Sequence, residues 1–382
     1  MRRLPLLLTS IGMALSAFAT EPVTVEQLNV VIVQERTLGD SKLASKLSCL
    51  LLTERLSSKQ LTQLRANLPG EKSRRALTTL ADAAVFLDPP WAEIVEKAAP
   101  DVGAQKQIVA RVVDYVAEAS HKLPNFFATR TTKRFEDWPL NYQKKGMVAV
   151  RYIPPQLVNT EQTMITYRNG AEVLESSKSK RARPEPMNMG LYATGLFGPV
   201  MTTVLVDSSR GSLKWSRWES GDSGDLAVFE FRIPLKASSY ELKFCCVPGP
   251  VPPSRMLFSR VTAYHGEIAV TPEDGTIRRL SLMADLDQGD LSSLAGDLEA
   301  GSPISRADLF VEYGPVEIGG KSYLCPVRGI AIARSKLEVW VKDEHGKHEE
   351  LGPERIYIND FAFGNYHVFR SEARILTGGI EP

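Results

Sequence analysis

The sequence predicts an α+β fold, in which a small N-terminal α-helical region precedes a large curved antiparallel β-sheet, a half-barrel with a covering helix. Two observations predict it. Apolar residues recur at helical spacing up to about residue 122. From Phe126 onward, short segments rich in β-branched and aromatic residues follow one another. Because these segments are joined by short connections, neighbouring strands are expected to run antiparallel.

The first 19 residues have the three parts of a secretory signal peptide. Arg2 and Arg3 give a charged start, Leu4–Ala17 an apolar core, and Ala17-Phe-Ala19 a small-x-small cleavage site. We expect cleavage near Ala19 and export to the periplasm or the extracellular space; a buried N-terminal helix is the alternative. No later segment has the ~18 continuous apolar residues of a membrane helix, so the mature chain is expected to carry no transmembrane segment.

The composition is that of a globular protein and gives no sign of nucleic-acid binding. Among the 382 residues, 46 Lys and Arg are balanced by 45 Asp and Glu, whereas a nucleic-acid-binding domain usually carries a basic excess. The length is ample for two cores. We predict a helical region over residues 20–122 and a β half-barrel domain over residues 123–382.

The helical region is expected to contain short helices packed in pairs. Capping boxes begin at Thr24 and Ser57, because each is followed three residues later by a Gln that can bond back to the helix start. One further helix face is predicted from a run of leucines at helical spacing, namely Leu43, Leu47, Leu50 and Leu51.

The second region is expected to be a succession of strands. The predicted strands cover residues 126–135, 147–153, 163–168, 171–174, 213–218, 226–233, 240–246, 264–270, 277–286, 307–313, 316–318, 323–327, 329–334, 337–341 and 357–369. Asn169-Gly170 and Gly319-Gly320 predict tight turns, since both positions of such a turn need positive φ. Pro199 favours a short helix toward Val206, with a strand as the alternative.

Alternation along the strands predicts one apolar sheet face and one mixed face, which is typical of an antiparallel sheet covered on one side. Phe229 and Phe231 share the apolar face of residues 226–233, and Leu280 and Leu282 that of residues 277–286. These four residues are the candidates to line a ligand site on the concave face. The alternative is that they form plain sheet core beneath a helix.

The four cysteines permit a structural disulfide in an exported protein. If the apolar faces of their strands meet in one core, Cys246 and Cys325 are the better pair; the alternative is that all four are small buried hydrophobic residues. Ligand spacing for a metal, a nucleophile elbow and a phosphate-binding loop are not found in the sequence. We therefore expect no catalytic residue, no metal site and no cofactor.

Several segments resemble a group of uncharacterised bacterial envelope proteins. They are Phe197-Gly-Pro199, Trp215-Ser-Arg-Trp218, residues 228–233, residues 264–268 with 275–279, residues 311–320 and residues 363–369. That group more distantly resembles the half-barrel of LolA-type lipoprotein carriers and the lipid-sensing domain of RseB-type regulators, over roughly residues 124–372. The resemblance implies a LolA-like sheet whose concave side holds acyl chains under a helical lid.

Together these observations predict an exported, non-enzymatic protein that binds a hydrophobic or lipid-linked ligand or an envelope lipoprotein. The expected partners are a lipid, a lipoprotein or another cell-envelope protein. A protein-interaction or envelope-stress sensor module without lipid cargo is the first alternative, and an exported hydrolase is the second.

Overall fold

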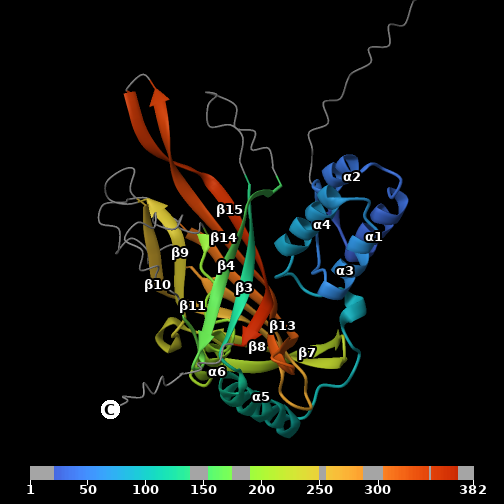
Figure 1. Ribbon diagram of the computed structural model, residues 1–382, viewed down its shortest axis with the longest axis vertical. Coiled ribbons are helices and arrows are strands. Elements are labelled where there is room, and N and C mark those ends of the chain that lie inside the picture. The colour runs from blue at the N-terminus through green and yellow to red at the C-terminus, as the bar shows by residue number, and fades with distance from the viewer. Residues whose placement is uncertain are drawn as a thin grey trace, which may run out of the picture.

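The computed structural model describes residues 21–137, 154–173, 190–248, 255–286, 304–343 and 346–368. The predicted signal peptide and the predicted strand over residues 147–153 lie outside these ranges. Within them the chain is an α+β protein built on a ten-stranded antiparallel sheet, which confirms the predicted fold class (Figure 1).

The N-terminal part of the chain folds into a small unit with its own core of buried leucines, Leu28, Leu43, Leu61 and Leu77 among them. Its elements are β1 (Glu21–Val23), α1 (Val25–Gln34), α2 (Asp40–Leu47), β2 (Leu50–Leu52), α3 (Ser58–Ala66), α4 (Glu71–Ala83) and the short 3₁₀ helix η1 (Trp91–Glu93). Both predicted capping boxes are present, at the starts of α1 and α3, so the local signals for helix start are confirmed.

One predicted helix face is wrong. α2 ends at Leu47, and β2 pairs in parallel with β1 instead of continuing the helix. Leu50 and Leu52 are buried whereas Leu51 is 37% exposed, which is the two-residue alternation of a strand. A short run of leucines fits both periods, and the pairing with β1 decides between them.

The large sheet is open and curved, and all its neighbouring strands are antiparallel. Its strands are β3 (Phe126–Glu136), β4 (Gln156–Arg168), β5 (Ala171–Val173), β7 (Ser212–Gly221), β8 (Gly224–Ile233), β11 (Ala263–Val270), β12 (Ile277–Asp285), β13 (Ile304–Ile318), β14 (Lys321–Asp343) and β15 (Gly346–Val368). They follow the order β5-β4-β3-β15-β14-β13-β12-β11-β8-β7. The predicted turns at Asn169-Gly170 and Gly319-Gly320 are confirmed, with all four residues at positive φ.

The concave face is covered by two helices and a second, three-stranded sheet. The helices are α5 (Val102–Lys122) and α6 (Pro199–Ser208), which lie across the lower end of the large sheet in Figure 1. The small sheet has the order β10-β9-β6, from β6 (Gly190–Leu191), β9 (Glu241–Pro248) and β10 (Arg255–Val261), and the 3₁₀ helix η2 (Leu235–Ala237) precedes β9. Val112 of α5, Val204 of α6 and Phe244 of β9 join one core with the sheet. The helix predicted after Pro199 is therefore confirmed, and α5 packs with the sheet although its residues fall in the predicted helical region.

A buried carboxylate ties α6 to the sheet. Asp207 is fully buried and accepts hydrogen bonds from Tyr264 Oη at 2.9 Å, from Ser239 N at 2.7 Å and from Arg210 Nη2 at 2.7 Å. Arg210 bonds one carboxylate oxygen, and Tyr264 and Ser239 bond the other. Both oxygens are therefore hydrogen-bonded, which lowers the cost of burying the charge. The helix that covers the concave face is thus fixed in place by polar contacts as well as by apolar packing.

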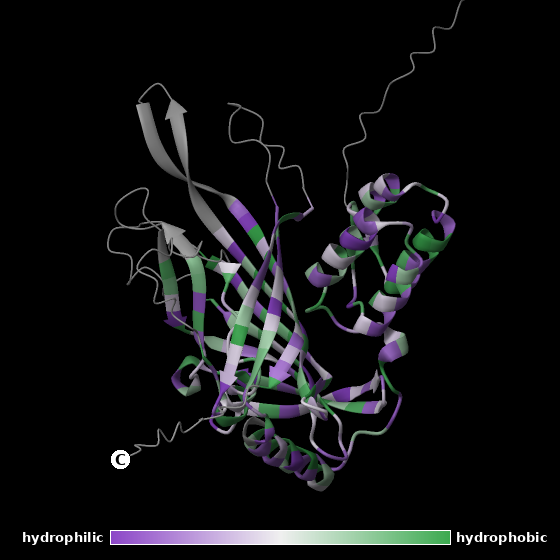
Figure 2. Cartoon of the chain, in the orientation of Figure 1, coloured by the Kyte–Doolittle hydropathy of each residue, from purple (hydrophilic) through white to green (hydrophobic). Residues whose placement is uncertain are grey.

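Hydrophobic and hydrophilic residues alternate along the strands and around the N-terminal helices (Figure 2). In the part of the chain that the structure describes, no helix is both long enough and apolar enough to span a bilayer.

Candidate functional site

The four predicted lining residues lie together on the concave face. Ile268 of β11 pairs with Phe229 of β8 on one side and with Leu280 of β12 on the other. Two residues earlier on β11, Gly266 pairs with Phe231 and Leu282 in the same way. All four are at most 2% exposed and belong to the core formed with α5 and α6. Their shared face was predicted correctly, and in this structure they pack against the protein's own side chains.

The predicted disulfide between Cys246 and Cys325 is wrong, because Cys325 is a free thiol. Cys325 is fully buried among aromatic rings such as Phe126 and Tyr167, and this burial raises the pKa of its thiol to about 12. The alternative of four unpaired cysteines also fails, since Cys245 of β9 is disulfide-bonded. The register of the β9–β10 strand pair shifts at this point, since Met256 pairs with Val247 and the next residue, Leu257, pairs with Cys245. Residue 246 is therefore skipped, and the two-residue alternation from which the Cys246–Cys325 disulfide was predicted is broken. The side chain of Cys246 lies outside the described part.

The helical unit covers the outer face of the large sheet, so the sheet is covered on both sides and not on one side as expected. Phe86, just after α4, packs edge-on against Phe310 of β13 with ring centroids 6.2 Å apart. Val85 joins Phe310, Ile330 of β14 and Phe135 of β3 in a small apolar cluster. We call this contact the helix–sheet interface.

One buried charge cluster in the helix–sheet interface is centred on Glu219 of β7. Its carboxylate, 2% exposed, accepts hydrogen bonds from Arg55 at 2.9 Å, from Arg279 at 2.8 Å and from Arg217 at 2.6 Å. Burial alone would raise the pKa of Glu219, but the three guanidinium groups outweigh it and lower that pKa to about 2. Arg55 comes from the helical unit, so this carboxylate joins the two parts of the chain.

A second cluster is centred on Asp82 of α4, whose side chain is fully buried. Its Oδ1 accepts a hydrogen bond from Arg328 Nη2 of β14 at 2.7 Å, whereas its Oδ2 has no hydrogen-bond partner among the described residues. The other charged groups that face this site are Asp360 of β15, Lys133 of β3, Glu312 of β13 and Arg65 of α3. Burial, and then the neighbouring Asp360, raise the pKa of Asp82 to about 7 despite Arg328.

Between the helical unit and the edge of the large sheet lies a groove of about 800 Å³. Its walls are the facing sides of α2 and α4, the chain around β2, the end of β3 and the start of β4. The lining residues are Ser41, Ala44, Ser45, Leu47, Ser48, Cys49, Leu50, Leu51, Lys72, Arg75, Ala76, Thr79, Leu80, Ala83, Phe135, Pro154, Pro155, Gln156 and Leu157. Most of these side chains are apolar or small, and the volume lies in the range of roughly 300–1,000 Å³ typical of small-molecule sites. This groove is the candidate site.

Sequence reasoning missed the groove because four separated segments build it. The serines and alanines of α2 recur every three or four residues and mark a helix face, but that pattern alone does not identify what faces it. Comparison with protein-family models, with curated proteins and with solved structures finds no match to this chain.

Proposed function

We propose that the protein is an exported, non-catalytic binding protein of the cell envelope whose ligand is a hydrophobic or lipid-linked molecule. The ligand occupies the groove between α2, α4 and the start of β4, in place of the concave face. The observation that carries this proposal is the groove itself, an opening of about 800 Å³ with a largely apolar lining. Burial of apolar surface would stabilise the bound state by about 25 cal/mol per Å². No covalent chemistry would be involved.

The concave face supports this proposal less well than the groove does. Phe229, Phe231, Leu280 and Leu282 are already buried in one core with residues of α5 and α6, so a ligand there would have to displace this packing. Asp207 holds α6 in place through Tyr264 and Ser239, which adds polar contacts to the cost of such a displacement. The resemblance to LolA-type carriers and RseB-type sensors stays part of the proposal for the fold and the cargo class, with the site at a different place.

Native mass spectrometry of the full chain purified from its own envelope tests the proposal. We expect a co-purified ligand in the wild type and its loss in Ala83→Trp, which places an indole in the groove from an exposed position on α4. Ala66→Trp is the matched control, because Ala66 is also an exposed final residue of its helix and lies outside the groove. A wild-type protein that carries no ligand and binds no lipid added to it would contradict the proposal.

The alternative is a protein-interaction or envelope-stress sensor module without lipid cargo. It is favoured by two exposed valines on α1, Val30 at 46% and Val33 at 51%, which form an apolar surface on the helical unit. In that case the double substitution Val30→Asp and Val33→Asp should abolish capture of an envelope protein. Ala83→Trp should leave this capture intact, which distinguishes the two functions.

A further inference from the structure

The groove has a direction, because its lining changes in character along α4. Six residues of α4 line it at spacings of three and four, so they form one helix face, and they are Lys72, Arg75, Ala76, Thr79, Leu80 and Ala83. The two cations come first, and three apolar residues and one threonine follow. From Lys72 to Ala83 the helix rises about 16 Å, at 1.5 Å per residue.

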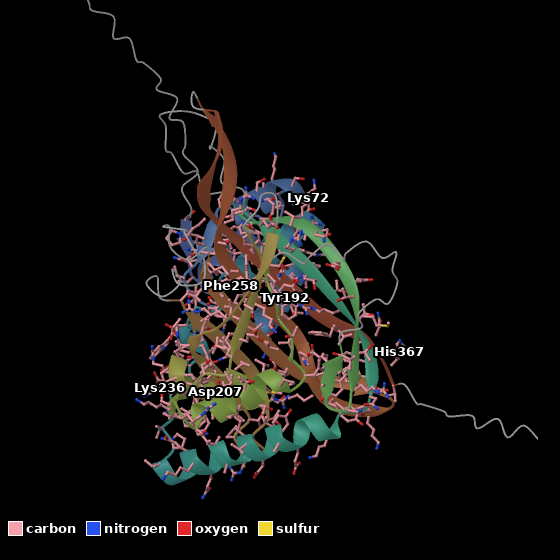
Figure 3. The ribbon with its side chains drawn as sticks, turned by 90° about the vertical axis from the view of Figure 1, so that its left-hand side faces the viewer. Lys72, Tyr192, Asp207, Lys236, Phe258 and His367 are labelled. Carbon is pink, nitrogen blue, oxygen red and sulfur yellow. The ribbon has the colours of Figure 1, made fainter. Side chains whose placement is uncertain are left out.

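The apolar end of the groove is the end at which α4 finishes. Phe135 lines the groove and also packs in the apolar cluster with Val85, which follows α4 by two residues. The cationic end lies at the first turns of α4, beside the serines of α2. Figure 3 labels Lys72 near the upper end of the molecule, far along its length from Asp207 on α6.

The positive charge of the cationic end is balanced only in part, by the Asp40 carboxylate that interacts electrostatically with Lys72. Lys72 and Arg75 are the only charged residues among those that line the groove, and neither forms a salt bridge within the described residues. The Lys72 ammonium donates to Ser41 Oγ at 2.9 Å and keeps donors to spare. Arg75 is exposed and its fork of N–H groups suits a carboxylate or phosphate.

The backbone amides at the start of α4 are already used. Asp40 accepts from Lys72 N at 3.0 Å and from Ser73 N at 2.8 Å, which caps the helix. An anion in the groove would therefore be held by the side chains of Arg75 and Lys72, with the Ser48 hydroxyl as a further donor in the lining. The hydroxyls of Ser45 and Thr79 already donate to Ser41 O and Arg75 O.

We infer that the groove takes an anionic amphiphile, with a carboxylate or phosphate head at Arg75 and Lys72 and an aliphatic chain that runs along α4 toward Phe135. This inference rests on the proposed function and adds the ligand class. Charge complementarity at one end and an apolar lining at the other select this class over a neutral or cationic lipid.

Calorimetric titration of the full chain with four probes that share one alkyl chain tests the inference. The probes are dodecanoate, dodecyl phosphate, dodecanol and dodecyltrimethylammonium, at low salt and below their micelle concentrations. The test variant is Lys72→Gln with Arg75→Gln. The control is Lys42→Gln with Lys59→Gln, which removes the same charge from exposed positions outside the groove.

We expect the wild type to bind the two anions more tightly than dodecanol. Each lost cation should weaken anion binding roughly two- to fivefold, as for an exposed ion pair, while dodecanol binding and the control variant stay unchanged. The tighter of the two anions identifies the head group. Equal affinity for all four probes, or an unchanged anion affinity in the test variant, would overturn the inference and leave the proposed function standing. Binding of none of the probes would overturn both.

Discussion

Arg328 of β14 donates from Nη2 to Asp82 Oδ1 of α4 at 2.7 Å, although the two residues are 246 positions apart in the chain. Their contact lies inside the helix–sheet interface, where both side chains are largely out of water. It connects the helical unit, which forms one wall of the groove, to the sheet, which forms the other. The stability of this ion pair therefore bears on the shape of the proposed binding site.

Replacing Arg328 with Ala should lower the free energy of unfolding by about 3–5 kcal/mol at pH 8, because Asp82 is left buried without its charge partner. The loss should be smaller at pH 5, where the carboxyl takes up a proton. Chemical denaturation at both pH values measures this. Arg232→Ala, at an exposed position on the same sheet, should change stability by no more than ~0.5 kcal/mol. Equal losses in the two variants would contradict the role given to Arg328.

Asp82 should make the protein less stable as pH rises from about 4 to about 7. Its pKa is raised from 3.8 to about 7 in the folded chain, so between these values the folded state holds a proton that the unfolded state has lost. The stability that Asp82 contributes is thus fully present below pH ~4 and is lost by about pH 7. In this range the free energy of unfolding should fall by up to about 1.4 kcal/mol per pH unit. Asp82→Asn mimics the protonated acid and should reduce the pH dependence of the free energy of unfolding between pH 5 and pH 7.5. A wild-type slope in this variant would assign the effect to another group.

Glu219 should act in the opposite direction in acid. Because its pKa is lowered from 4.5 to about 2, the stability that it contributes is present above pH ~4.5 and is lost as pH falls toward 2. Glu219→Gln should be less stable than the wild type at pH 7 and should lose this part of the acid sensitivity. Denaturation curves at pH 7, pH 4 and pH 2.5 measure both effects. If the variant lost as much stability as the wild type between pH 4 and pH 2.5, this acid sensitivity would not come from Glu219.

Phe231→Ala should affect stability and spare ligand binding. The ring is 2% exposed within the main core, so its removal should cost about 3–5 kcal/mol in unfolding free energy. Affinity for dodecanoate, measured where the variant is still folded, should stay at the wild-type value. A variant that keeps its stability and loses binding would return the ligand site to the concave face.

Much of the fold could be predicted from local signals. The capping boxes at Thr24 and Ser57, and the Asn169-Gly170 turn, depend on residues within one turn of each other. The apolar concave face could be predicted because Phe229 and Leu280 follow the period of a strand, which is fixed by backbone geometry.

The helix–sheet interface could not be predicted in this way. Glu312 and Arg279 alternate with apolar residues along their strands, which is the pattern of side chains that face solvent. The sequence alone does not show that the helical unit covers them. Arg55 and Glu219 are 164 positions apart, so their pairing depends on the tertiary fold alone. The groove was missed for the same reason, because α2, α4 and the start of β4 meet only after folding.

Cys49 offers a direct report on the groove, since it is a free, partly accessible thiol that lines it. A bound ligand should slow its alkylation by a thiol reagent in the native protein. Cys325 serves as the internal control, because it is buried and its raised pKa keeps it as the unreactive thiol. Peptide mass spectrometry distinguishes the two sites, and an alkylation rate at Cys49 that is indifferent to dodecanoate would place the ligand elsewhere.

We propose the groove between the helical unit and the sheet as the binding site. The most direct test of this proposal is the affinity of the full chain for dodecanoate in the wild type, in Ala83→Trp and in the control Ala66→Trp, measured by calorimetric titration. We expect Ala83→Trp to weaken binding by at least about tenfold, a loss of roughly 1.4 kcal/mol, with wild-type affinity in the control. Wild-type affinity in Ala83→Trp would contradict it.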